Sequence, residues 1–267
     1  VIGMHYFSPV PKMPLLDIIT TDKTAPWVTA TALDMGLAQG KTCIVVKDGP
    51  GFYTTRILAP LLNEAVLLVE EGADSVDIDR AMRQFGYPVG PITLIDEVGI
   101  DVGAHVAMGL GKMFAARGMQ SSDAFPKLTA KGYKGKKNKK GFYRYDGKKK
   151  KGKKIPNEEV YALLGAAPRK KFDAKLIQQR VSMMMINEAL ICLQEGIISC
   201  PRDGDIGAVF GLGFPPFEGG PFRYIDRVGA SSVKATLESL EKTYGNRFAP
   251  PQILKDIVQS GRKFYGE

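Results

Sequence analysis

The sequence has 267 residues, of which 44% are hydrophobic and 24% are charged. This balance is typical of a soluble globular protein, and it excludes a disordered chain, a collagen and a small disulfide scaffold. Because no run of about 18 apolar residues and no basic-then-apolar leader occurs, we expect neither a membrane span nor a signal peptide. The chain opens in a predicted strand without an initiator Met, so we expect it to be a piece of a longer polypeptide.

The positive charge is concentrated in one segment. The formal net charge is +9, but residues 127–171 hold 17 Lys and Arg against 3 acids, which leaves 20 against 25 elsewhere. An excess confined to one segment does not describe a generally basic surface, and this disfavours nucleic acid as a partner.

The cysteines are odd in number and form no CxxC pair: Cys43, Cys192 and Cys200. This pattern argues against a disulfide framework or a zinc site and favours a reducing compartment.

The first fifty residues read as α/β. β-Branched residues predict strands over 1–7, 15–19 and 42–46, with a helix over 25–37. Such a small sheet is not expected to be stable alone. From residue 50 onward helical spacing replaces the strand signals. We therefore predict a mainly α fold with a small α/β start.

The helical region repeats itself. Arg56, Asn63-Glu64-Ala65 and Glu71-Gly72 recur 124 positions later, as Arg180, Asn187-Glu188-Ala189 and Glu195-Gly196. Later motifs recur at offsets of 127 and 130, which small loop insertions explain. Two copies of a helical unit, each with an apolar face that it cannot bury alone, are expected to pack as a dimer built into one chain.

A strongly basic tract, residues 147–154, lies between the two copies. We interpret it as a solvated linker that is kept extended by repulsion between its lysines. The alternative is that Lys148–Lys154 attract an anion, either the headgroups of an anionic membrane or the phosphates of a ligand. Nucleic acid ranks last, because no aromatic residue lies within the run to stack on bases.

The two histidines are candidate general bases. His105 lies on a predicted helix with Asp101 as its one acid at helical spacing, which favours a structural role. His5 lies near the end of a strand, where α/β sheets present side chains to ligands, and Asp17 on the next strand could fix its tautomer. Spacing alone leaves this dyad and an ordinary strand histidine beside a surface aspartate equally open.

Four motifs occur in the order seen in 3-hydroxyacyl-CoA dehydrogenases: His5-Tyr6-Phe7-Ser8-Pro9, Asp48-Gly49-Pro50-Gly51-Phe52, Gly86-Tyr87-Pro88-Val89-Gly90-Pro91 and Gly141-Phe142-Tyr143. The second copy, with Gly211-Leu212-Gly213-Phe214-Pro215-Pro216 and Gly219-Gly220-Pro221-Phe222-Arg223-Tyr224, resembles the multifunctional enzymes of fatty-acid β-oxidation, the mitochondrial trifunctional type most of all. The resemblance covers essentially the whole chain except the Lys-rich linker.

This resemblance implies a domain order. Residues 1–49 would be the C-terminal end of a Rossmann-type NAD-binding domain, and 50–146 the first helical dehydrogenase C-terminal domain. A Lys-rich linker would follow over 147–171, and a second helical copy, packed on the first as an internal pseudo-dimer, over 172–267.

The resemblance also implies roles for residues at matching positions. His5 would take the proton of the substrate 3-hydroxyl, and Asp17 would orient it. The family pattern has Glu at the position of Asp17, so we expect a backbone shift or a bridging water to make up the missing methylene. Thr55 and Tyr224 would contact the substrate, and Ser8 and Lys137 the NAD cofactor.

Two features depart from the family pattern. Lys139 stands where relatives have a glycine, and a positive φ at that position would strain it. No GxGxxG motif occurs in the sequence, so we expect this chain not to hold NAD alone. The family places that motif upstream, with a hydratase domain further upstream still.

The leading hypothesis is an NAD-dependent 3-hydroxyacyl-CoA dehydrogenase within a multifunctional hydratase/dehydrogenase of β-oxidation. Its substrate would be 3-hydroxyacyl-CoA, and its compartment the mitochondrion, with the peroxisome as the alternative. The rival hypothesis is a non-catalytic acyl-CoA-binding or assembly module that docks a thiolase partner and an anionic membrane. An upstream strand-GxGxxG-helix unit would discriminate between them.

Overall fold

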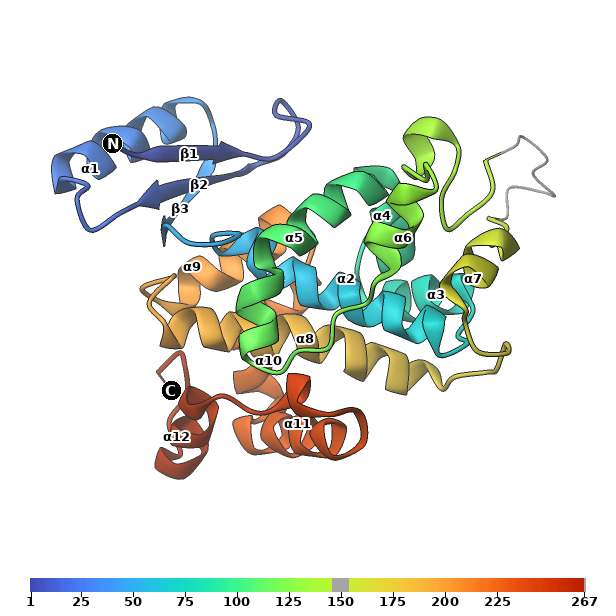
Figure 1. Cartoon of the computed structure of the whole chain (residues 1–267). Coiled ribbons are helices and arrows are strands. Elements are labelled where there is room, and N and C mark those ends of the chain that lie inside the picture. Colours follow the sequence, from blue (N-terminus) through green and yellow to red (C-terminus); the bar gives the residue numbers. More distant parts are fainter. Residues whose placement is uncertain (146–153, 267) are drawn as a thin grey trace. The chain divides into compact units, whose positions relative to one another are not determined.

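A computed structural model describes residues 1–145 and 154–266 (Figure 1). The chain forms two compact units. One comprises Val1–Leu58 and Met185–Glu267, and the other comprises Ala59–Met184. The boundaries between them fall inside two long helices, α2 (Thr54–Glu70) and α8 (Ala174–Gln194).

The first unit opens with a three-stranded sheet of order β1-β2-β3. Strands β1 (Gly3–Tyr6) and β2 (Leu15–Thr20) are antiparallel, whereas β2 and β3 (Thr42–Lys47) are parallel and joined through helix α1 (Pro26–Ala38). These elements confirm the sequence prediction. Strand β2 is buried along nearly its whole length, as a central strand covered on both faces must be.

Helices from the C-terminal part complete the first unit. They are α9 (Pro201–Ile206), the π-helical turn η2 (Gly207–Gly211), η3 (Pro216–Glu218), α10 (Pro221–Val228), α11 (Ala230–Tyr244), η4 (Asn246–Phe248) and α12 (Gln252–Ser260). The turn η2 packs closely on the sheet: a Cβ on Gly211 would lie 2.6 Å from Leu15 Cδ2 and 3.3 Å from Phe7 Cε1. The absence of a side chain at Gly211 therefore lets the backbone of this turn approach Leu15 at the start of β2.

The second unit is helical. Besides its parts of α2 and α8 it contains α3 (Ser75–Phe85), α4 (Pro91–Val98), α5 (Ile100–Ala116), α6 (Ala124–Ala130), the short 3₁₀ helix η1 (Lys136–Asn138) and α7 (Glu158–Leu164). Helix α7 lies inside the predicted linker 147–171. Its apolar side chains Val160 and Leu164 are buried, which the lysines preceding it in the sequence did not suggest.

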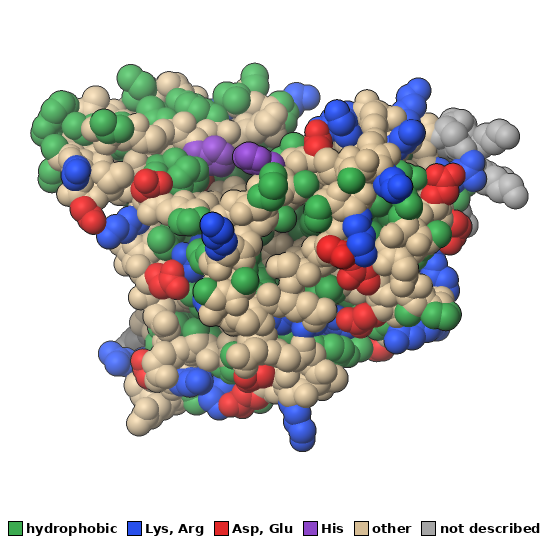
Figure 2. Space-filling model, viewed as in Figure 1, with side chains coloured by type: hydrophobic (Ala, Val, Ile, Leu, Met, Phe, Trp, Pro, Cys, Tyr) green, Lys and Arg blue, Asp and Glu red, His purple; other side chains and the backbone are tan. Residues whose placement is uncertain are grey.

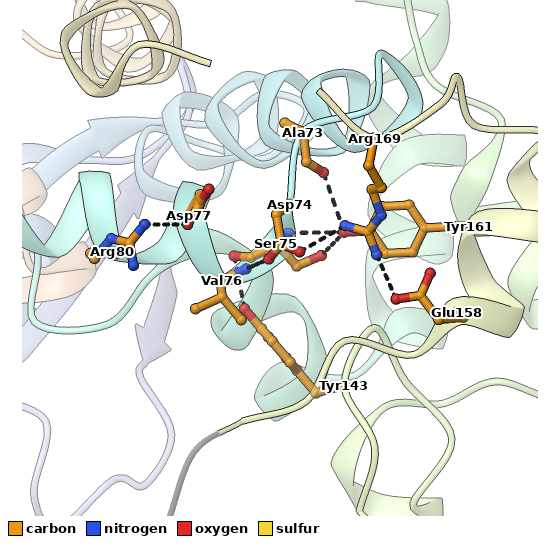
Figure 3. A network of polar contacts seen from close by, with 10 residues as sticks. All are labelled: Ala73, Asp74, Ser75, Val76, Asp77, Arg80, Tyr143, Glu158, Tyr161 and Arg169. Atoms are coloured by element: carbon orange, nitrogen blue, oxygen red, sulfur yellow. Dashed lines mark hydrogen bonds and ion pairs between the residues drawn. The ribbon is translucent and has the colours of Figure 1, made fainter. Parts of the chain in front are cut away.

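A polar network joins α7 and the segment after it to the start of α3 (Figure 3). The hydroxyl of Tyr161 accepts a hydrogen bond from the backbone N–H of Ser75 at 2.8 Å. The guanidinium of Arg169 lies 3.3 Å from the centre of the Tyr161 ring and pairs with Asp74 and Glu158. Residues 154–171 are thus part of the second unit.

The internal repeat appears as the same polar contacts in each unit. In the second unit, Asp79 accepts hydrogen bonds from the backbone N–H groups of Ile92 and Thr93, and from the Tyr143 hydroxyl. The equivalent residue in the first unit, Asp205, accepts from Phe222 N–H, Arg223 N–H and the Tyr265 hydroxyl. Each carboxylate therefore ties the start of one helix to a tyrosine near the end of its copy.

A second pair of carboxylates extends the parallel. Asp96 accepts from the N–H groups of Phe142 and Tyr143, and Asp226 accepts from those of Phe264 and Tyr265. Burial raises the pKa of Asp96 and that of Asp205 to about 6, against the hydrogen bonds that lower them.

The repeated arginines make buried ion pairs. Arg56 Nε donates to Glu188 Oε1 at 2.7 Å within the first unit, and Arg180 Nε donates to Glu64 Oε1 at 2.7 Å within the second. These four side chains are at most 3% exposed. The two arginines lie 124 positions apart in the sequence, as do the two glutamates, and each arginine makes the same buried contact in its own unit.

Candidate functional site

The sheet register brings His5 and Asp17 together. The two residues are directly opposite in the antiparallel pair of β1 and β2, so their side chains project from the same face. His5 Nδ1 lies 3.1 Å from Asp17 Oδ2. Because a carboxylate can only accept, Nδ1 carries the proton and Nε2 holds the free lone pair of the neutral ring.

Burial distinguishes the two members of this dyad. The side chain of Asp17 is fully buried, whereas that of His5 is 35% exposed. Histidine side chains are visible at the surface in Figure 2. The contact is direct, so the shorter Asp arm needs no bridging water. The alternative expected a surface aspartate, and this part is wrong because the Asp17 side chain has no exposed surface. The role of His5 as a base stays a prediction.

Two phenylalanines enclose the His5 ring. Its centroid lies 4.7 Å from that of Phe7 and 5.9 Å from that of Phe52. Phe52 has φ +45°, a left-handed conformation that is rare for a bulky residue and is concentrated at functional sites. The turn Gly49-Pro50-Gly51-Phe52 therefore places an aromatic ring against the imidazole at a conformational cost.

Thr54, the first residue of α2, contacts Asp17 of the dyad. Its side chain is fully buried, and its Oγ1 donates a hydrogen bond of 2.9 Å to Asp17 Oδ2. Sequence reasoning missed both Thr54 and Phe52. A polar residue at the start of an apolar helix, directly after a Gly-Pro-Gly turn, was the signal that could have drawn attention to Thr54.

The other first-unit candidates differ in exposure. Ser8 is exposed and lies two residues after the end of β1. Thr55 is half-buried next to Thr54, and Tyr224 is half-buried on α10. The ring of Tyr224 packs edge-on against Phe214, with centroids 6.5 Å apart. Burial raises the pKa of the Tyr224 hydroxyl. Their proposed contacts with substrate and cofactor stay predictions.

Lys137 belongs to the second unit. It lies in η1, and its Nζ pairs with Oδ1 of Asp101, in the first turn of α5, at 2.5 Å. The next but one residue, Lys139, has φ +62°. The expectation that a lysine in this glycine position is strained is therefore confirmed. His105 is exposed on α5.

A cavity of about 450 Å³ lies in the C-terminal part of the first unit. Its walls include Arg202, Phe210, Arg223 and Tyr265, and none of the dyad residues. The guanidinium of Arg223 stacks on the Tyr265 ring at 3.9 Å.

Charged residues of both signs are interspersed over the face shown in Figure 2. Within residues 1–145 and 154–266, no cluster of His, Cys, Asp and Glu is arranged to hold a metal ion. The helices described there are too short or too polar to cross a bilayer. The three cysteines are free.

Two family models match the chain. The NAD binding domain of 3-hydroxyacyl-CoA dehydrogenase matches residues 1–49. The C-terminal domain of 3-hydroxyacyl-CoA dehydrogenase matches two segments, 51–145 and 176–264. The predicted fold class, a truncated dinucleotide domain followed by helical dehydrogenase domains, agrees with both matches.

Curated relatives are bacterial. The fatty acid oxidation complex subunit alpha of Shewanella amazonensis is 52% identical over 265 residues, which are 99% of this chain and 37% of that protein. The corresponding subunit of Shewanella loihica is also 52% identical over 265 residues, with the same coverage. The chain thus spans little more than a third of the length of these relatives.

Solved structures agree with the fold. The 3-hydroxybutyryl-CoA dehydrogenase of Escherichia coli K12 covers 98% of this chain and 71% of its own, with a TM-score of 0.80 at 23% identity. The (S)-3-hydroxybutyryl-CoA dehydrogenase of Ralstonia eutropha is 36% identical and covers 54% of this chain and 52% of its own, with a TM-score of 0.52. The likeness to the first of these structures concerns the fold alone. The two family models together match most of the chain, and the chain therefore belongs to the 3-hydroxyacyl-CoA dehydrogenase family.

Proposed function

We propose that the protein containing this chain oxidises 3-hydroxyacyl-CoA to 3-ketoacyl-CoA with NAD, as the dehydrogenase part of a multifunctional β-oxidation enzyme. The observation that carries the proposal is the His5–Asp17 pair: a partly exposed imidazole whose Nδ1 is held by a fully buried carboxylate. Membership of the dehydrogenase family supplies the reaction class.

In this reaction the substrate loses the hydroxyl proton and the hydride on C3. His5 Nε2 takes the proton, because Nδ1–H is already donated to Asp17 and the lone pair of the ring lies on Nε2. The imidazolium so formed is stabilised by the negative charge of Asp17, which the surrounding apolar residues do not screen. Phe7 and Phe52 limit the directions from which the substrate can reach the ring.

NAD, when bound, accepts the hydride from C3. For this cofactor we propose contacts from Ser8, which is exposed two residues after β1, and from Lys137, whose Nζ is paired with Asp101 and would exchange that partner to reach NAD. The sequence contains no GxGxxG turn to cradle the pyrophosphate. Under this proposal another part of the protein supplies that turn; the matched region covers 37% of the length of the curated relative from Shewanella amazonensis.

The test is turnover of the full-length protein with His5 replaced by Ala. We expect His5→Ala to lower kcat by about 100-fold or more, the range for a general base, with the melting temperature little changed. His105→Ala is the matched control, since it removes the other histidine from an exposed helix face. Unchanged turnover in His5→Ala would overturn the proposal.

A second candidate function is assembly. The curated relatives are named as subunits of a complex, and we propose that a thiolase subunit is the partner. The membrane contact predicted for Lys148–Lys154 lies largely outside the described residues. Its last member, Lys154, donates to Thr93 Oγ1 at 2.5 Å and lies over the Tyr143 ring.

Co-sedimentation with anionic vesicles tests the membrane contact separately from catalysis. Neutralising Lys148–Lys151 should abolish binding, whereas Lys154→Gln alone should leave most of it, because Lys154 is already engaged within its unit. Binding that survives the neutralisation would contradict this function.

We propose a mitochondrial location on the strength of the resemblance of the second copy to the mitochondrial trifunctional type, whereas the two relatives named above are bacterial. Subcellular fractionation of the source organism with an antibody to this chain tests it. Recovery in the peroxisomal fraction, or a source without mitochondria, would overturn it.

A further inference from the structure

We propose that Thr54 is a positioning residue for the catalytic dyad, and that its hydroxyl fixes the Asp17 carboxylate in the orientation that holds His5. The role of Thr54 rests on the proposed dehydrogenase function, and the sequence alone did not indicate it.

The geometry converges on one oxygen atom. Asp17 Oδ2 accepts from Thr54 Oγ1 at 2.9 Å and lies 3.1 Å from His5 Nδ1. A carboxylate oxygen has two lone pairs, so these two donors fill it. The other oxygen, Asp17 Oδ1, is buried without a hydrogen-bond partner among the described residues.

This asymmetry matters because the last torsion of an aspartate side chain is soft and nearly two-fold. With only His5 as a partner, the carboxylate could turn and present either oxygen to the imidazole. A second donor on Oδ2 sets the plane of the carboxylate. The cost is one unpartnered buried oxygen, which a purely structural arrangement would be expected to avoid.

The position of Thr54 suits this task. The residue is fully buried in the first turn of α2, where the backbone is fixed, and a β-branched side chain has few rotamers. A threonine at a helix start ordinarily uses its oxygen to accept a hydrogen bond from the helix backbone. Here the hydroxyl proton is directed to Asp17. The Asp17 side chain is one methylene shorter than the Glu that the family resemblance implies at this position. The hydrogen bond from Thr54 orients the Asp17 carboxylate despite this shorter side chain.

The test is steady-state kinetics of the full-length protein with Thr54→Val, which keeps the shape and removes the hydroxyl. We expect kcat to fall about tenfold, the order that follows from losing one hydrogen bond to a charged group. The KM values for 3-hydroxyacyl-CoA and NAD should change by less than about twofold, since Thr54 contacts the dyad and not the ligands. A kcat within about twofold of the wild type would overturn the proposal.

A double-mutant cycle separates positioning from a merely structural role. Adding Thr54→Val to Asp17→Ala should cause no further loss of kcat, because the hydroxyl acts only through that carboxylate. A further tenfold loss would overturn the proposal. The matched control is Thr20→Val. Thr20 lies on β2, the strand that carries Asp17, and its hydroxyl donates to Val46 O at 3.3 Å and not to the dyad. This control should keep its kcat.

If Thr54→Val does not fold, the pair Thr54→Ser and Thr54→Ala carries the same comparison, because the two differ by one oxygen. Ser should keep most of the activity and Ala should lose about tenfold, and equal kcat values would overturn the proposal. Failure of the proposed function itself is recognised separately, by full turnover in His5→Ala.

Discussion

The buried arginine of the second unit gives a sharp test of how the core is held together. Arg180 is fully buried and bonds Glu64, which is also fully buried, and Glu71, which is 35% exposed. Replacing Arg180 by Met removes the positive charge that lies against the fully buried Glu64 carboxylate. Glu71 can rehydrate, but Glu64 cannot.

The cost follows from that difference. Breaking a buried ion pair by removing one partner typically destabilises a protein by about 3–5 kcal/mol, because the remaining charge is uncompensated. Arg180→Met should therefore lower the free energy of unfolding by about 4 kcal/mol. The double variant Arg180→Met with Glu64→Gln carries no buried charge at this place and should recover most of that loss.

Urea unfolding followed by far-ultraviolet circular dichroism measures both values. The control is Lys127→Met, whose ion pair with Asp123 is exposed at both ends and should be worth less than about 1 kcal/mol. A loss below about 1 kcal/mol in Arg180→Met, or a double variant no more stable than the single one, would refute this account of the core.

Three further predictions concern local features. Because the pKa of Asp205 is about 6 in the folded chain and about 3.9 when unfolded, the folded state binds more protons between these values. Its contribution to stability is therefore lost as the pH rises from 4 to 6, by about 3 kcal/mol in total. The pKa of Asp96 is also about 6, so that carboxyl contributes a similar loss over the same range. Asp205→Asn should therefore reduce the pH dependence of the free energy of unfolding, measured with urea, by the share of one carboxyl, and an unchanged pH dependence would contradict the assignment. Lys139→Gly should raise the free energy of unfolding by about 0.5–1 kcal/mol by relieving the left-handed backbone, and a loss would show that the lysine is not strained. Gly220→Ala should lower the free energy of unfolding by about 3 kcal/mol or more, since φ is +116° and the new Cβ would overlap the Asp205 carboxylate. The control Gly109→Ala, with open space around it in α5, should be neutral or stabilising. Equal changes of melting temperature in the two variants would argue against the overlap.

The sheet could be predicted from the sequence because runs of β-branched residues indicate its strands. For the dyad, spacing alone left the pairing of His5 and Asp17 open, and the family resemblance implied it; the two residues lie opposite each other on antiparallel strands. The repeat was equally visible, because Arg56 and Arg180 each need a buried glutamate and the sequence keeps both at constant spacing.

Thr54 and Phe52 could not be predicted in the same way. Their contacts with the dyad arise where the turn after β3 returns to β2, so they depend on the fold and not on a local pattern. Helix α7 was not predicted for another reason: lysines dominate the composition of 147–171, while the helix buries only three residues, Val160, Tyr161 and Leu164. The left-handed backbone of Lys139 could be predicted, because the family resemblance implies glycine at this position and glycine adopts positive φ without strain.

The most direct test of the account is a single turnover of the full-length protein on 3-hydroxyacyl-CoA carrying deuterium at C3. The account predicts that the deuterium appears in the reduced NAD, and that His5→Gln slows this transfer by about 100-fold or more while substrate still binds. Transfer at the wild-type rate in His5→Gln, or release of the deuterium to water, would contradict the assignment of His5 as the base in a hydride transfer to NAD.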